Sequence, residues 1–170
     1  MFLVKVLGIA VVLVLLYFLM IMPRILGRPS REPFMHVLYA HRGLHDNSSE
    51  APENSMAAFA KAVGAGYGIE CDVQVTKDNV PVIFHDFTLA RMARYEEGKE
   101  PEDAIRNQDG TIGVKGRVCD YTYDELRKFH LADSDEKIPK FEDFLKLVDG
   151  KAPLIVELKI EYKNLTVCRK

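Results

Sequence analysis

The sequence has no tryptophan, only three cysteines and almost no net charge. A formal charge of −2 over 170 residues gives no electrostatic footprint for nucleic acid, so we expect no nucleic-acid partner. The cysteines, Cys71, Cys119 and Cys168, are odd in number and contain no Cys-x-x-Cys pair, which excludes a disulfide framework and a zinc site. Cys71 has apolar neighbours and is expected to be a small buried hydrophobe.

One long apolar run occupies the amino-terminal end. From Phe2 to Met22 the only charged residue is Lys5. As a helix, this run would be about 31 Å long, which matches a bilayer core of about 30 Å. A cleaved signal peptide is the alternative, but its apolar core is usually about 7–15 residues long. Small residues suited to cleavage are also absent before Pro23. We therefore expect a single-pass transmembrane anchor over residues 1–23.

Basic residues flank this run unevenly. Lys5 lies on its amino-terminal side, whereas Arg24, Arg28 and Arg31 follow it. The positive-inside tendency therefore favours a cytoplasmic location for the rest of the chain. Residues 24–36 are rich in Arg, Pro and Gly and are expected to form a juxtamembrane linker.

Beyond the linker, the apolar periodicity alternates between that of strands and that of helices. Strand signals cover residues 37–41, 69–76, 80–85 and 153–159, and helix signals start near residues 54, 122 and 141. Two helical stripes are expected, namely Met56, Phe59, Ala60 and Val63, and Phe141, Phe144, Leu145 and Val148.

This order of elements predicts an α/β fold with a parallel sheet and helical crossovers. An open doubly wound sheet is the alternative. The short turn at residues 77–79 also leaves open a hairpin, and with it a mixed sheet. Residues 91–116 have no apolar period and are expected to form a long loop or insertion.

Carboxylates recur on one face of two of these strands. Glu70 and Asp72 share a face of the second strand, and Glu157 and Lys159 share a face of the last one. Two carboxylates about 7 Å apart on one face would repel each other. A hard cation between them removes that penalty, and Mg²⁺ and Ca²⁺ prefer carboxylate oxygens. Glu157 is the candidate third carboxylate ligand.

Histidines and an arginine stand at the carboxyl ends of two other strands, where sites of α/β folds gather. His41 and Arg42 end the first strand, and His85 ends the third. Two histidines can serve as general base and general acid, and an arginine offers a planar fork for phosphate oxygens. Taken alone, each of these residues is more often a solvated surface group. Their recurrence on separate strands favours a phosphodiester hydrolase.

Other titratable residues have no such support. The histidines expected to be surface or packing residues are His36, His45 and His130. Arg91 and Arg94, in the polar segment, are expected to be solvated rather than to bind a ligand.

A series of motifs between about Tyr39 and Lys159 resembles the glycerophosphodiester phosphodiesterases in order and spacing. The motifs are His41-Arg42-Gly43, Pro52-Glu53-Asn54-Ser55, Gly68-Ile69-Glu70-Cys71-Asp72-Val73, Thr76-Lys77-Asp78, Pro81-Val82, His85-Asp86 and Glu157-Leu158-Lys159. His-Arg-Gly alone would be a weak signal, but the full ordered series is highly specific.

The resemblance implies a (β/α)₈ TIM barrel that hydrolyses a glycerophosphodiester to an alcohol and glycerol 3-phosphate, as part of lipid metabolism. It implies attack by the substrate's own glycerol 2-hydroxyl, giving a cyclic phosphate that water then opens. The implied roles are general acid/base for His41 and His85, phosphate contact for Arg42 and Lys159, Ca²⁺ or Mg²⁺ binding for Glu70, Asp72 and Glu157, and support of the site for Glu53 and Asn54.

The chain is short for such a barrel, which needs about 250 residues. We expect residues 37–160 to hold about the first four barrel strands of a truncated domain, and residues 161–170 to form a tail. The expected partners are a small-molecule or lipid-derived phosphodiester and, through the anchor, a membrane. The alternatives are a lysophospholipase D-type activity on membrane lysophospholipids and a catalytically silent, truncated, membrane-tethered module. A phosphatidylinositol-specific phospholipase C fits the motifs less well.

Overall fold

A computed structural model describes residues 2–22 and 27–159 of the chain. The described residues divide along the chain into two units, with the boundary between Met35 and His36. The expected tail at residues 161–170 lies outside the described residues.

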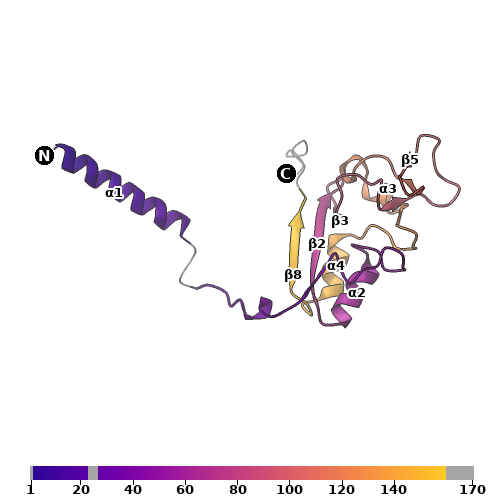
Figure 1. The fold of residues 1–170 in the computed structure, drawn as a ribbon, viewed down its shortest axis with the longest axis horizontal. Coiled ribbons are helices and arrows are strands. Elements are labelled where there is room, and N and C mark those ends of the chain that lie inside the picture. The colour runs from indigo at the N-terminus through magenta and orange to yellow at the C-terminus, as the bar shows by residue number, and fades with distance from the viewer. Residues whose placement is uncertain (1, 23–26, 160–170) are drawn as a thin grey trace. The chain divides into compact units, whose positions relative to one another are not determined.

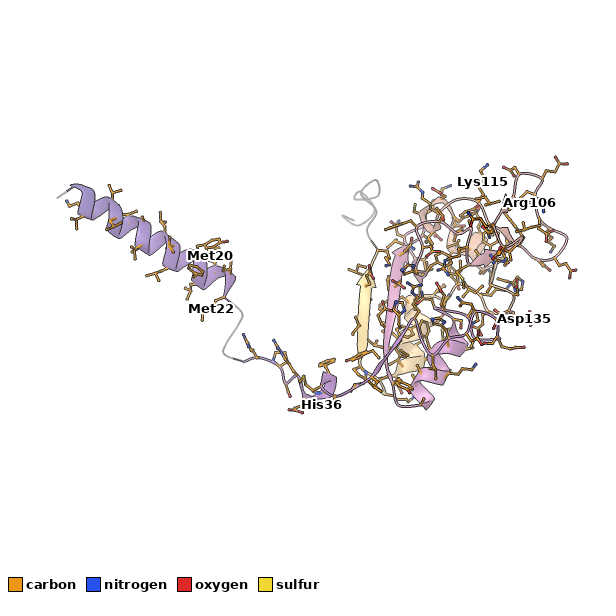
Figure 2. All side chains as sticks on the ribbon, viewed as in Figure 1. Met20, Met22, His36, Arg106, Lys115 and Asp135 are labelled. Atoms are coloured by element: carbon orange, nitrogen blue, oxygen red, sulfur yellow. The ribbon has the colours of Figure 1, made fainter. Side chains whose placement is uncertain are left out.

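The first unit consists of a long helix followed by a short one. Helix α1 covers Phe2–Ile21, and the 3₁₀ helix η1 covers Glu32–Phe34. Between Val4 and Ile21 the mean hydropathy is 2.8, none of this stretch is buried, and the side chains stand away from the helix on all sides (Figure 2). The helix is therefore long and apolar enough to cross a membrane, a property that anchors and signal sequences share.

The second unit is built on a mixed four-stranded sheet (Figure 1). Its strands are β1 (Tyr39–His41), β2 (Gly68–Val75), β3 (Pro81–Ile83) and β8 (Leu154–Leu158). Strand β2 pairs in parallel with both β1 and β8, and antiparallel with β3. Strands β2 and β3 therefore form the hairpin that was one of the two possibilities from the sequence. The connection between them is too short for a crossover.

The expectation of four successive barrel strands is corrected by this topology. Three strands, β1, β2 and β8, run in parallel side by side, and β3 is an antiparallel addition to β2. Within the described residues the strands do not close into a barrel, and β1 and β8 each pair only with β2. An adjacent parallel trio with helical connections is the arrangement found within a (β/α)₈ barrel.

Helices α2 (Met56–Gly64) and α4 (Phe141–Val148) pack against this sheet and against each other. Phe59 and Phe144 are fully buried, with ring centroids 4.4 Å apart. The expected stripes are correct except at their i+4 members, because Ala60 and Leu145 are exposed. Each helix lies at the surface and buries only a narrow face.

The segment expected to be a long loop is exposed over much of its length, and it contributes to a second core near its two ends. The short elements of this region are β4 (Ala93–Arg94), β5 (Ile105–Arg106), β6 (Ile112–Gly113), η2 (Val118–Asp120), α3 (Tyr123–Leu126) and β7 (His130–Leu131). Met92, Ala93 and Val114 are buried with Leu126 and Leu131 in one apolar cluster. The apolar residues are spaced irregularly because they come from turns and two-residue strands, which have no helical or strand period.

Candidate active site

The pairing register of β2 brings the predicted residues into one group. His41 of β1 is the register partner of Glu70, and Glu157 of β8 is the partner of Asp72. Side chains at paired positions of parallel strands point to the same face of a sheet. One carboxylate oxygen from each of Glu70, Asp72 and Glu157 therefore lies within 4.8 Å of the others.

Asp72 lies at the centre of this group and is almost fully buried, with 1% of its surface exposed. Its Oδ2 accepts a hydrogen bond from Asn54 Nδ2 (3.1 Å) and lies 3.6 Å from Arg42 Nε. Its Oδ1 lies 3.1 Å from Lys159 Nζ. Cationic and amide groups thus surround the carboxylate and offset the cost of its burial.

Lys159 follows β8 and bridges two of the carboxylates. Its Nζ is also 2.8 Å from Glu157 Oε1. Partial burial acts to lower the pKa of the ammonium group, but the adjacent Glu157 and Asp72 carboxylates outweigh it and hold the pKa above its ordinary value. Lys159 therefore carries its charge at neutral pH.

The turn after β1 brings the backbone of Arg42 against Glu70. Arg42 has a left-handed backbone (φ 58°), and its amide N–H donates to Glu70 Oε2 over 3.0 Å. Gly43 follows at φ 83°, and a Cβ atom there would lie 2.9 Å from Ala58. A glycine is therefore required for the turn to lie against α2. His41 is largely exposed, and its Nε2 is 4.0 Å from Glu70 Oε2.

Glu53 and Asn54 form a second turn that is hydrogen-bonded to the turn after β1. Asn54 also has a left-handed backbone (φ 59°), and its N–H donates to the carbonyl oxygen of Arg42 (2.9 Å). The buried Glu53 carboxylate accepts hydrogen bonds from Arg42 (3.2 Å), Asn47 (3.2 Å) and Arg91 (3.1 Å). Burial acts to raise the pKa of Glu53, but Arg91, Asn47 and Arg42 together lower it, so the carboxylate is ionised.

His85 follows β3 and is oriented by its neighbour. Its Nδ1 lies 2.6 Å from Asp86 Oδ1, and Arg91 Nε donates to Asp86 Oδ2 over 2.6 Å. Burial acts to raise the pKa of Asp86, but the bonds from Arg91 and His85 lower it. Gln74 on β2 holds this turn by donating to the carbonyl oxygens of Phe84 and Asp86.

Of the two arginines expected to be solvated, Arg91 keeps 46% of its side chain exposed, whereas Arg94 keeps 15%. Arg91 contacts both Glu53 and Asp86, and Arg94, mostly buried, donates to the carbonyl oxygens of Ala90, Arg91 and Ala93. No apolar period marks the segment, so its local sequence gives no sign of these contacts. Asp86 was likewise missed as a site residue, although its position after His85 at a strand end is a signal. His36 and His45 are exposed as expected, and His130 packs against Ser134 and Lys137.

The residues present fit a hard divalent cation. Three carboxylates converge, and in the described part of the chain the buried Asn54 Oδ1 accepts no hydrogen bond, whereas Asp72 Oδ1 has the Lys159 ammonium group 3.1 Å away. Buried polar atoms of this kind usually have a partner. Oxygen ligands at such a density are what Mg²⁺ and Ca²⁺ prefer.

Comparison with known proteins agrees with this geometry. The sequence matches the glycerophosphoryl diester phosphodiesterase family over residues 41–169. A glycerophosphodiester phosphodiesterase of Bacillus altitudinis is 35% identical over 76% of this chain and 46% of its own length. Glycerophosphodiester phosphodiesterase 1 of Homo sapiens is 35% identical over 61% of this chain and 28% of its own length.

Solved structures give the same result. An Oleispira antarctica phosphodiesterase in complex with the product sn-glycerol-3-phosphate matches with a TM-score of 0.58 and 25% identity, over 84% of this chain and 55% of that one. A glycerophosphoryl diester phosphodiesterase from Parabacteroides distasonis matches with a TM-score of 0.55 and 28% identity, over 76% of this chain and 40% of that one. The chain spans about half, or less, of the length of these relatives. It belongs to the glycerophosphoryl diester phosphodiesterase family.

Proposed function

We propose that this chain hydrolyses glycerophosphodiesters to an alcohol and glycerol 3-phosphate with the help of Ca²⁺ or Mg²⁺. The observation that carries this proposal is the convergence of Glu70, Asp72 and Glu157 from two paired parallel strands. Family membership and the glycerol 3-phosphate bound by the Oleispira antarctica phosphodiesterase support the reaction.

Glu70, Asp72 and Glu157 would hold the cation. When bound there, a divalent cation supplies positive charge that polarises a phosphoryl oxygen and stabilises developing negative charge. Asn54 and Lys159 would orient the Asp72 carboxylate, to which both lie close. Lys159, placed between Asp72 and Glu157, would also contact a phosphate oxygen.

Arg42 would bind the substrate phosphate. Its guanidinium is held at one nitrogen by Glu53, and its Nε has no well-aligned hydrogen-bond partner among the described residues. The fork geometry of arginine matches two phosphate oxygens. The Glu53 bond would orient that fork beside Asp72.

His41 and His85 would move the protons. Because Asp86 engages Nδ1 of His85, the atom free to exchange a proton is its Nε2. His41 is open to solvent and lies next to Glu70. One histidine would take the proton of the glycerol 2-hydroxyl as it attacks phosphorus, and the other would protonate the departing alcohol oxygen.

The test is release of glycerol 3-phosphate from glycerophosphocholine by the full chain in detergent micelles. Activity is expected with added Ca²⁺ or Mg²⁺ and not with a chelator, and Asp72→Asn, Glu157→Gln and His85→Gln should each abolish it. The exposed Glu97 provides a matched control, and Glu97→Gln should leave activity unchanged. Full activity in all three site variants would overturn the proposal.

Metal binding can be measured without turnover. A cation that binds only the folded state raises the melting temperature by mass action. We expect Ca²⁺ or Mg²⁺ to raise that of the wild-type chain and not that of Asp72→Asn. No response in either protein, together with no turnover, would favour the catalytically silent module.

A second substrate class is favoured by α1. An apolar helix of this length would hold the chain at a bilayer, where lysophospholipids lie, so we propose residues 1–23 as the anchor, 24–36 as the linker and 37–160 as the phosphodiesterase region. Lysophosphatidylcholine in mixed micelles should then be cleaved to choline and lysophosphatidic acid. Cleavage of glycerophosphocholine alone would exclude the lysophospholipase D-type reading.

A further inference from the structure

The guanidinium of Arg91 lies between two carboxylates from different turns. It donates to Asp86 from Nε (2.6 Å) and from Nη2 (3.0 Å), and it donates to Glu53 from Nη1 (3.1 Å) and from Nη2. The arginine therefore makes a two-point contact on each side. Of its five N–H groups, most are used in these bonds, which leaves Arg91 poorly suited to bind a substrate phosphate.

On one side, this contact orients the Asp86 carboxylate toward His85. The only other partner of the Asp86 carboxylate in the described structure is His85 Nδ1. An ionised carboxylate accepts hydrogen bonds and cannot donate them, so Nδ1 of His85 carries the hydrogen. Nε2 then carries no hydrogen, and its lone pair can accept a proton.

On the other side, Arg91 contacts the carboxylate that holds Arg42. Glu53 is 6% exposed at its side chain and accepts from both arginines. Through Glu53, the Arg91 side chain thus links the turn that carries His85 to the turn that carries Arg42.

The positive charge of Arg91 also explains why Glu53, His85 and Asp86 lie close together. These three residues are separate from the carboxylate cluster of β2 and β8. Ligand atoms of Glu53, His85 and Asp86 lie within 4.8 Å of one another, a spacing that could hold a metal ion. Each of the two carboxylates already has the Arg91 guanidinium as its cation. The guanidinium therefore supplies positive charge to both carboxylates.

We propose that Arg91 is a positioning residue that fixes His85 in the Nδ1–H tautomer by clamping Asp86 against Glu53. The inference deepens the proposed phosphodiesterase function and rests on it for the role of His85. The arginine does not touch the reacting atoms, and it acts only through Asp86 and Glu53.

The first test does not depend on turnover. ¹⁵N-histidine spectra of the full chain in detergent micelles report which ring nitrogen carries hydrogen, and His85→Gln identifies the His85 signals. The wild-type chain is expected to show the Nδ1–H form alone at a pH where the ring is neutral. Arg91→Ala should give a mixture of tautomers, whereas Arg127→Ala, which removes an exposed arginine paired with Asp124, should not. An unchanged tautomer in folded Arg91→Ala would overturn the proposal.

The second test uses kinetics. Arg91→Ala is expected to lower kcat roughly 10- to 100-fold, the usual range for a residue that orients a functional group, with KM changed less than about threefold. Because the effect on His85 passes through Asp86, Arg91→Ala should lower kcat by less than about twofold in an Asp86→Asn background. Full additivity of the two substitutions would contradict the proposal.

A conservative variant covers the case in which Arg91→Ala does not fold. In Arg91→Lys a single ammonium group can reach one carboxylate but cannot contact both at two points. An intermediate tautomer mixture and an intermediate kcat are expected. Wild-type behaviour in both measurements would overturn the proposal. If the wild-type chain shows the Nδ1–H form but no turnover, the proposed function fails and the positioning role stands.

Discussion

Neighbouring residues on β2 have opposite environments because successive side chains of a strand point to opposite faces. Asp72 faces the candidate active site, and Cys71 faces the apolar layer formed with α2 and α4. Burial, with the charges of Glu70 and Asp72 adding to it, raises the pKa of the Cys71 thiol to about 12. Only a minute fraction of this thiol is ionised near neutral pH, and the thiolate is the reactive form.

We therefore predict that Cys71 resists alkylation in the folded chain. In a Cys168→Ser background, maleimide or iodoacetamide at pH 8 should modify the partly exposed Cys119 first and Cys71 only on unfolding. Mass spectrometry of peptides gives the two rates. The same rate at both cysteines in folded protein would contradict the buried placement of Cys71.

Acid should remove part of the stability that Glu53 contributes. The folded pKa of Glu53 lies below the ordinary value of 4.5, since Arg91, Asn47 and Arg42 outweigh the opposing effect of burial. A carboxyl of this kind stabilises the fold above its unfolded pKa, and that contribution is lost as pH falls through the folded pKa. Charged hydrogen bonds contribute about 1.5–3 kcal/mol each, so Glu53→Gln should be clearly less stable at pH 7.

The measurement is thermal unfolding of the wild-type chain and Glu53→Gln between pH 7 and pH 3, in chelator. The gap in melting temperature between them should stay constant down to about pH 5 and shrink below it. Glu50→Gln, at an exposed position of the same loop, serves as the control and should track the wild type. A gap that does not change with pH would show that the ion pairs of Glu53 do not stabilise the fold.

At the scale of elements, helix α2 is capped from a distant part of the chain. Ser55 Oγ accepts from the Ala58 N–H (3.1 Å), as an N-cap serine does. Glu136 Oε2 accepts from the Met56 N–H (2.9 Å) and contacts the Ala57 N–H (3.4 Å). A carboxylate at this end also interacts favourably with the helix dipole.

Removing that cap should destabilise the whole second unit. Glu136→Ala is predicted to lower the free energy of unfolding by about 1–2 kcal/mol, and Glu136→Gln by less, because the amide oxygen can still accept. Urea unfolding followed by circular dichroism measures both. Glu97→Ala at an exposed position should stay within about 0.5 kcal/mol of wild type. Equal stability of all variants would show that the Glu136 contact is dispensable.

The apolar periodicity predicted the helices and strands that bury one regular face. It failed for segments whose conformation depends on tertiary contacts. The alternation of Glu70 and Asp72 with apolar residues gave β2 and its polar face, and the pairing register then explains why Glu157 joins them. The direction of β3 could not be read from its residues, because a strand pattern is the same in either direction. Arg91 was expected to be solvated, and its side chain is 46% exposed, but its ion pair with Glu53, 38 residues away, could not be predicted from the local sequence.

At the scale of the whole molecule, the candidate site uses a small part of the fold. Its carboxylates come from β2 and β8, His41 ends β1, Arg42 follows β1 and His85 follows β3. The matched regions cover 46%, 28% and 55% of the lengths of three of the relatives. Ile155, Val156 and Leu158 of β8 are exposed in the described structure, and β8 has a pairing partner on one side only. An unpaired strand edge of this kind is a template for pairing with another strand.

Whether the molecule is a membrane protein depends on helix α1. The apolar composition of this helix allows a direct test. We predict that the expressed chain retains its amino-terminal residues in mass spectra and stays in the membrane fraction after alkaline carbonate extraction. Leu13→Arg together with Leu16→Arg places two charges in the middle of the apolar run, at a cost of about 2.5–3.5 kcal/mol each for insertion. This variant should move to the soluble fraction. Loss of residues 1–23 from the mature wild-type chain would show instead that the run is a signal sequence.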